Sequence, residues 1–163
     1  MNPELLKKFR SVKLLVLVID GVLTDGKLYY SAEGESLKVF HVLDGAGIKL
    51  LQKNNIPVAV ISARNSKAAE TRLTELGVEY LYQGQSDKMP AFIELCEKLG
   101  LNPKEVAYMG DDLADLPIMK QVGLRITVPN AVAIIKQEAD YQTTRSGGLG
   151  AVREVCDLIL HGN

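Results

Sequence analysis

The 163-residue sequence has little of what builds disulfide-rich or metal-cluster proteins. It contains no tryptophan, three phenylalanines, two histidines and two cysteines. Two cysteines are too few for a disulfide framework or a cysteine metal cluster, and His41 and His161 lack metal-ligand spacing. Cys96 and Cys156 both fall on apolar helical stripes, so we expect both to be buried, in a protein of the reducing cytoplasm.

An excess of either charge is also missing. Lys and Arg total 19 and Asp and Glu total 20, so the net charge is -1. This balance argues against general binding to nucleic acid or to an anionic membrane. No run approaches the roughly 18 apolar residues of a membrane span. The N-terminal MNPELLKKFRSVK is charged and unlike a secretory signal. With 47% hydrophobic residues and no linker or repeat, residues 1–163 are expected to form one domain.

Short apolar runs alternate with amphipathic helical patterns along the chain. The run Leu14–Ile19 is continuously apolar and stops at Asp20, as in a strand buried on both faces. Further strands are predicted over 57–61, 78–82, 106–109 and 124–128. One helix is predicted to start from an N-cap at Asp44, and others to span 69–76, 89–99 and about 149–160. The alternation predicts an α/β fold with a doubly wound parallel sheet.

One segment breaks this alternation. Residues 27–31 and 36–42 are strand-like and flank Ala32-Glu33-Gly34-Glu35, which predicts a small β-hairpin inserted after the first strand. The hairpin, about residues 27–42, is too short to bury Tyr29, Tyr30 and Phe40 by itself. We therefore expect it to need a partner surface, either the domain or another subunit.

Polar residues follow several of the predicted strands. Asp20 follows the first strand, Ser62 and Arg64 the second, and Asp111 and Asp112 the fourth, while Lys88 opens the helix between them. In an open parallel sheet, ligands bind outside the carboxyl ends of the strands. Carboxylates without a nearby His or Cys suit Mg²⁺ better than Zn²⁺. A hydroxyl, helix N-terminal amides and a lysine suit a phosphate, so the pattern indicates a metal-assisted phosphoryl site.

Each of these residues also has a structural interpretation. Asp20 and Asp111 could be loop caps, Ser62 alone is more typical of a helix cap, and Lys88 or Arg64 alone is more typical of a solvated surface. The glycine-rich 147–150 is more typical of a turn before the last helix than of a phosphate loop. The functional interpretation rests on their joint placement at successive strand ends, which independent caps would not require.

The motifs resemble those of the haloacid dehalogenase superfamily. The resemblance lies in DGVLTDG at 20–26, Ser62, Lys88 and GDDxxD at 110–115. It extends over nearly the whole chain, because the hairpin, FHVLDG at 40–45, YQGQSDK at 82–88 and GGLGAVREV at 147–155 resemble the capless sugar-acid phosphate phosphatases of lipopolysaccharide synthesis. The resemblance implies an enzyme without a large cap, dependent on Mg²⁺, and a homotetramer assembled through the hairpins. A small sugar phosphate is the implied substrate.

The resemblance also implies roles for individual residues. In such enzymes one aspartate attacks phosphorus, and a second, two residues later, protonates the leaving alcohol and then activates water. Asp20 matches the second aspartate. Ser62 would hold phosphoryl oxygens and Lys88 would neutralise charge. The metal would be held by Asp111, with help from Asp112 and from the backbone carbonyl of Asp20. Thr24, Ala63 and Arg64 complete the implied phosphate- and substrate-binding set.

The nucleophile position is Val18, which departs from the family pattern. Valine has no lone pair and can neither form the covalent intermediate nor ligate Mg²⁺. A register with Asp20 as nucleophile fails because Val22 would then be the acid. Three explanations stay open: a substitution in an otherwise complete enzyme, a natural and catalytically dead relative, or replacement by another residue. A smaller departure is Ala63, where the family usually has glycine.

Three functions are considered for this pattern of residues. The first is a phosphomonoesterase acting on a small sugar-acid phosphate, impaired at Val18. The second is a non-catalytic binding or assembly module, which Val18 favours and the retained Asp20, Lys88 and Asp111 oppose. The third is a receiver-like domain that accepts a phosphoryl group, which the inserted hairpin and the placement of Ser62 and Lys88 fit poorly.

Overall fold

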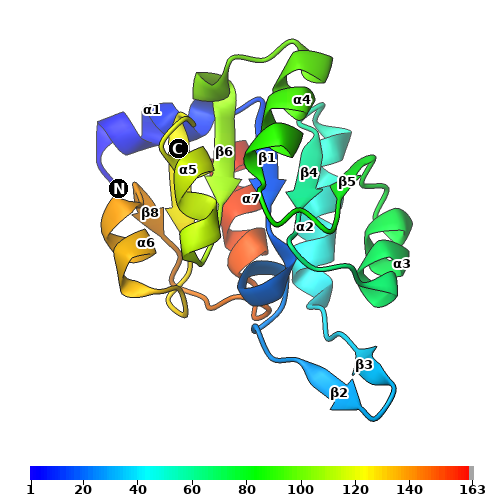
Figure 1. Ribbon diagram of the computed structural model, residues 1–163. Helices are drawn as coiled ribbons and strands as arrows, with labels where there is room; N and C mark the ends of the chain where they lie inside the picture. The colour runs from blue at the N-terminus through cyan, green and yellow to red at the C-terminus, as the bar shows by residue number, and fades with distance from the viewer. Residues whose placement is uncertain (162–163) are drawn as a thin grey trace.

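The computed structural model describes residues 1–161 as a six-stranded parallel sheet between helical layers, with a two-stranded hairpin at one edge (Figure 1). The strand order is β5-β4-β1-β6-β7-β8, and every pair in it is parallel. This confirms the predicted doubly wound α/β sheet. The strands are β1 (Leu14–Leu17), β4 (Val58–Ile61), β5 (Tyr80–Tyr82), β6 (Val106–Met109), β7 (Leu124–Thr127) and β8 (Tyr141–Gln142).

Helices cover both faces of the sheet. Figure 1 shows α4 and α5 in front of it and α2 and α7 behind it, and α2 packs extensively on α7. Within residues 1–161, no helix is long and apolar enough to cross a membrane. The helices are α1 (Pro3–Arg10), α2 (Val42–Lys53), α3 (Lys67–Glu75), α4 (Met89–Leu99), α5 (Leu116–Met119), α6 (Ala133–Glu138) and α7 (Ala151–His161).

The buried core follows the apolar runs of the sequence. All four residues of β1, β4 and β6 are buried, as expected for central strands covered on both faces. Cys96 and Cys156 are 6% and 0% exposed, which confirms the prediction that both are buried. The first strand was predicted to reach Ile19 but ends at Leu17. After Val18 the chain turns into a short loop, η1 (Ile19–Leu23), where Gly21 has a φ of +89°.

The hairpin is shorter than predicted. Its strands are β2 (Tyr29–Ser31) and β3 (Gly34–Leu37), so residues 38–42 do not form part of a strand. Tyr29 and Tyr30 are 38% and 61% exposed, whereas Phe40 is partly buried against the core, so for this residue the domain supplies the partner surface that was expected. The apolar side chain of Phe40 thus anchors the return from the hairpin to the domain.

The predicted N-cap at Asp44 is also wrong. Helix α2 begins at Val42, and the ring nitrogen Nδ1 of His41 caps it by accepting from the Leu43 amide at 3.2 Å. Asp44 lies inside α2, is 1% exposed, and its Oδ1 accepts from the Arg153 amide at 2.8 Å. Burial raises the pKa of this carboxyl above its usual value. Asp44 therefore caps the start of α7 from a neighbouring helix, a contact that local sequence patterns do not reveal.

An ion-pair network fixes the far edge of the sheet and gives a pH-dependent prediction. The Oδ1 of Asp140 accepts from Lys8 at 2.9 Å and from the Nη2 of Arg125 at 2.8 Å, and its Oδ2 accepts from the Arg125 amide at 2.9 Å. Burial opposes ionisation of Asp140, but the hydrogen bonds from Arg125 and Lys8 outweigh it and lower its pKa from 3.8 to about 2.

A lowered folded-state pKa stabilises the fold above the unfolded pKa. This contribution is lost as the pH falls from about 4 through about 2, and it amounts to about 2 kcal/mol. Asp140→Asn should therefore lower the free energy of unfolding at pH 6 and flatten its decline in acid, as measured by urea denaturation from pH 6 to pH 2.5. Asp87→Asn, which alters only a local bond to the Met89 amide, is the control. An unchanged acid decline in Asp140→Asn would contradict the prediction.

Candidate functional site

A cavity of about 230 Å³ opens at the carboxyl ends of β1, β4 and β6. These three strands are neighbours in the sheet, so the segments that follow them meet at one edge. The cavity also receives the start of α4 through Lys88. It is lined by Val18, Ile19, Asp20, Gly26, Ser62, Ala63, Arg64, Lys88, Asp111, Asp112 and Ala114.

The structure brings together all the predicted site residues except one. Thr24 does not line the cavity. It is 2% exposed, and its hydroxyl oxygen accepts from the amides of Gly21 at 3.3 Å and Gly26 at 3.2 Å. The prediction that Thr24 binds phosphate or substrate is therefore not supported by its position. Its hydroxyl shapes the loop that follows β1 instead.

The wall of the cavity nearest the sheet is largely buried. Val18 is 3% exposed and Ser62 is 4% exposed, at the ends of neighbouring strands. Lys88 is 7% exposed, so it is not the solvated surface lysine that it would be if taken alone. Its Nζ donates to the Oδ1 of Asp115 at 2.7 Å. The buried carboxylate balances the charge of the ammonium and holds it in place at the wall of the cavity.

Asp115 was part of the predicted motif but was not assigned a role in the site. It is fully buried, and its Oδ1 also accepts from the Tyr108 hydroxyl at 2.8 Å. Its Oδ2 accepts from the amides of Asp111 at 2.9 Å and Asp112 at 3.1 Å. One carboxylate therefore ties Lys88 to the loop that follows β6. The signal in the sequence was the motif GDDxxD at 110–115, which includes Asp115 but does not show its partners.

The loop after β6 carries the two aspartates predicted to bind metal. The cap in this loop is Asp112 and not Asp111, for which the structural interpretation had allowed it, since the Asp112 carboxylate accepts from the Leu113 amide at 2.7 Å. Burial, and then the nearby Asp115 carboxylate, raises the pKa of Asp111 from 3.8 to about 7. The Asp111 carboxylate lies against Gly21. A side chain at position 21 would not fit, because its Cβ would lie 1.9 Å from the Oδ2 of Asp111.

The raised pKa of Asp111 indicates a carboxylate that a bound cation would stabilise. The oxygen ligands available here suit a hard divalent cation. Within residues 1–161, however, no three Asp, Glu, His or Cys side chains gather in a metal-binding group. Valine stands where the resemblance implies a carboxylate, and Asp20 was expected to ligate through its carbonyl. The donors present, two carboxylates and one carbonyl oxygen, are of the kind that suits a divalent cation, with one carboxylate fewer than the resemblance implies.

Two residues near the cavity were missed by the sequence analysis. Lys38, just after β3, donates from Nζ to the Oδ1 of Asp20 at 2.6 Å. Glu35, within β3, lies 3.3 Å from the Nη2 of Arg64. Both come from the hairpin, which thus contacts the site of its own chain. No local pattern signals these contacts, because they depend on how the hairpin folds back.

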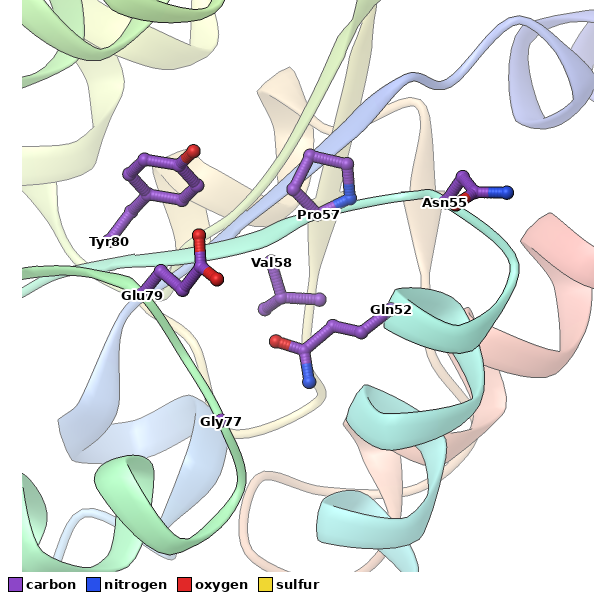
Figure 2. A pocket seen from close by; sticks show the side chains of 7 residues that line it. All are labelled: Gln52, Asn55, Pro57, Val58, Gly77, Glu79 and Tyr80. Carbon is purple, nitrogen blue, oxygen red and sulfur yellow. The ribbon is translucent and has the colours of Figure 1, made fainter.

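A second cavity, of about 310 Å³, lies at the opposite end of β4 and β5 (Figure 2). Figure 2 shows Val58 and Tyr80, the first residues of these strands, beside Gln52 and Glu79. The amide of Gln52 donates to the Leu76 carbonyl at 2.9 Å and is thereby occupied in the fold. None of the predicted site residues lines this cavity, so the chemistry is concentrated at the first one.

Comparisons with known proteins bear on the fold and the family. Residues 80–154 match the family model of haloacid dehalogenase-like hydrolases. The 3-deoxy-D-manno-octulosonate 8-phosphate phosphatase of Salmonella typhimurium is 49% identical over 160 residues, which cover 98% of this chain and 85% of that enzyme.

Solved structures agree with this match. The phosphatase of the same name from Moraxella catarrhalis, in complex with magnesium, phosphate and KDO (3-deoxy-D-manno-octulosonate), is 42% identical with a TM-score of 0.94, covering 98% of this chain and 92% of that one. A cobalt-bound phosphatase for the same octulosonate phosphate from Haemophilus influenzae is 40% identical with a TM-score of 0.91, covering 94% and 90%.

Proposed function

The chain belongs to the KDO 8-phosphate phosphatase family of the haloacid dehalogenase superfamily, and on that premise we propose that its cavity is a magnesium-dependent phosphomonoesterase site in which Val18 replaces the nucleophile. The observation that carries the proposal is the common cavity of Val18, Ser62, Lys88 and Asp111. A scaffold alone would not require a buried lysine and a raised-pKa aspartate beside a phosphate-sized space.

The residues divide the work of phosphate transfer between them. Ser62 binds the phosphoryl oxygens, and the buried Lys88 neutralises their charge. With an aspartate at position 18 to attack phosphorus, Asp20 would protonate the leaving alcohol and then take a proton from the water that hydrolyses the aspartyl-phosphate. Asp111, Asp112 and the Asp20 carbonyl would hold the cation, which would supply positive charge beside the phosphoryl group. Arg64, with a side chain that is 39% exposed, faces the sugar acid.

The proposed substrate is KDO 8-phosphate. Its hydrolysis is a step of lipopolysaccharide synthesis in the cytoplasm. The test is the release of inorganic phosphate from KDO 8-phosphate and a panel of sugar phosphates in the presence of Mg²⁺, for this chain beside Val18→Asp. Hydrolysis by Val18→Asp alone supports the proposal.

The alternative is a module that binds a sugar phosphate without turnover, which the buried, unreactive side chain of Val18 favours. Binding of KDO 8-phosphate by both proteins without hydrolysis by either would favour this alternative.

The proposed cation gives a prediction about stability. Millimolar Mg²⁺ should raise the thermal midpoint of this chain, because a ligand that binds only the folded state stabilises it by about 1.4 kcal/mol at tenfold its dissociation constant. Asp111→Asn should abolish this shift, whereas Asp25→Asn, on the exposed part of the first loop, should preserve it. Differential scanning fluorimetry with and without Mg²⁺ measures the effect. An equal shift in Asp111→Asn would contradict the proposed ligand.

Assembly through the hairpin is the remaining part of the proposal. Tyr30, Leu37 and Val39 are 61%, 47% and 54% exposed, an apolar surface that a second copy would cover. Light scattering should give four times the 17.8 kDa of the chain. Leu37→Asp should dissociate the tetramer, and Ile93→Asp, at a 50% exposed position on α4, should leave it intact. A monomer at micromolar concentration would contradict the role of the hairpin.

A further inference from the structure

The hairpin places a buried lysine against the proposed site. The side chain of Lys38 is 2% exposed, although it follows an exposed strand. Its Nζ lies 2.6 Å from the Oδ1 of Asp20 and 3.1 Å from the Oε2 of Glu35. A buried ammonium is costly unless it is paired and hydrogen-bonded, and here two carboxylates pair it. The contact with Asp20 is not used by the mechanism proposed above.

Glu35 extends this contact to the loop after β4. Its Oε1 accepts from the Ser66 hydroxyl at 2.9 Å, and its Oε2 accepts from the Nη2 of Arg64 at 3.3 Å. The same Nη2 donates to the Tyr30 hydroxyl at 3.0 Å. The hairpin is therefore hydrogen-bonded to the residue that caps α3 and to the arginine at the mouth of the cavity.

The four charged side chains of this network balance one another. Asp20 and Glu35 are carboxylates, and Lys38 and Arg64 are cations, with the Nε of Arg64 3.8 Å from the Oδ2 of Asp20. Because the set is neutral, it offers little spare charge to attract a substrate anion. What it does supply is orientation, since an aspartate held from both sides loses its rotational freedom before the substrate arrives.

We propose that Lys38 is a positioning residue, which holds the Asp20 carboxylate at the wall of the cavity where a leaving alcohol would lie, and that Glu35 anchors Lys38 and Arg64 from the hairpin. The inference rests on the proposed function, in which Asp20 protonates that alcohol. The hairpin then serves the site of its own chain, in addition to any role in assembly. Displacement of a reacting group by about 1 Å can lower a rate 100-fold.

The test compares two substrates in full-length Val18→Asp. KDO 8-phosphate has an alcohol leaving group that must be protonated, whereas p-nitrophenyl phosphate has one that leaves without a proton. Lys38→Met should lower kcat/KM for KDO 8-phosphate by about 100-fold and leave that for p-nitrophenyl phosphate nearly unchanged. Lys38→Arg should recover part of the loss. Lys27→Met, which removes an exposed hairpin lysine, should change neither value.

Equal losses on both substrates would overturn the positioning role and leave the proposed function standing. If Val18→Asp hydrolyses neither substrate, the proposed function fails and the catalytic role of Lys38 falls with it. A cycle of Lys38→Met and Asp20→Asn in the chain with Val18 tests the contact without activity. Urea denaturation should show coupling of at least about threefold in the unfolding equilibrium constant. Additive effects would overturn the contact itself.

Discussion

Val18→Asp is expected to raise the rate of KDO 8-phosphate hydrolysis by several orders of magnitude, up to about 10⁶-fold, because removal of a covalent nucleophile costs that much in other enzymes. Val18 is 3% exposed and lines the same cavity as Ser62, Lys88 and Asp111. A carboxylate there would face the phosphoryl group and form the aspartyl-phosphate, while the alcohol leaves with a proton from Asp20.

The measurement is kcat and KM for phosphate release with Mg²⁺, and the matched control is Val18→Asn. Asparagine has nearly the size of aspartate and is polar, but it lacks the charged carboxylate oxygen that attacks phosphorus. Val18→Asn should therefore stay inactive. Activity in the chain with Val18 would show that the motif register or the nucleophile assignment is wrong. Inactivity of all three proteins on every sugar phosphate would favour the binding module.

The same substitution should reduce stability when Mg²⁺ is absent. Valine at the end of β1 is apolar, buried and suited to a strand, whereas a carboxylate would be desolvated beside Asp111. Added Mg²⁺ should offset the loss in Val18→Asp more than it stabilises the chain with Val18. The fold therefore does not depend on the group that the reaction needs, which explains how the sheet can persist with valine at this position.

The sheet could be predicted from the sequence because its strands are buried on both faces. The run at 106–109 became β6 with the predicted bounds, since four consecutive buried residues leave an unbroken apolar signal. The hairpin lacks such a signal, because β2 and β3 are exposed or partly exposed along their whole length. The start of α2 was missed because His41, and not Asp44, caps it.

The candidate site was predictable for a related reason. Residues that directly follow parallel strands must meet at one edge, so Ser62 and Asp111 could be placed together without any tertiary information. Lys38 and Glu35 could not be placed there, because their contacts with Asp20, Arg64 and Ser66 depend on how the hairpin folds back onto the domain. The inward turn of the Thr24 hydroxyl was likewise invisible in the sequence. Contacts that follow from strand topology can be predicted from the sequence, and contacts that depend on side-chain direction cannot.

The second large effect is expected at Asp115, where Asp115→Asn should lower the free energy of unfolding by about 3–5 kcal/mol, the usual result of breaking a buried ion pair. Asp115 is fully buried, and Lys88 beside it is 7% exposed and would lose its counter-ion. An asparagine that keeps its oxygen toward Lys88 and Tyr108 would turn its amide nitrogen toward the amides of Asp111 and Asp112. Donors would then face donors, so neither orientation restores the bonds.

Urea denaturation without Mg²⁺ measures this loss, and Asp157→Asn is the matched control. Asp157 pairs with Arg153 on the surface of α7 and is 44% exposed, so its loss should cost less than about 1 kcal/mol. Lys88→Met added to Asp115→Asn should recover stability, because it removes the stranded ammonium. A cost for Asp115→Asn as small as that of the control would mean that water reaches Lys88. The Lys88 ammonium would then be screened by water and no longer held in one place, and the proposed binding of phosphate by Lys88 would lose its physical basis.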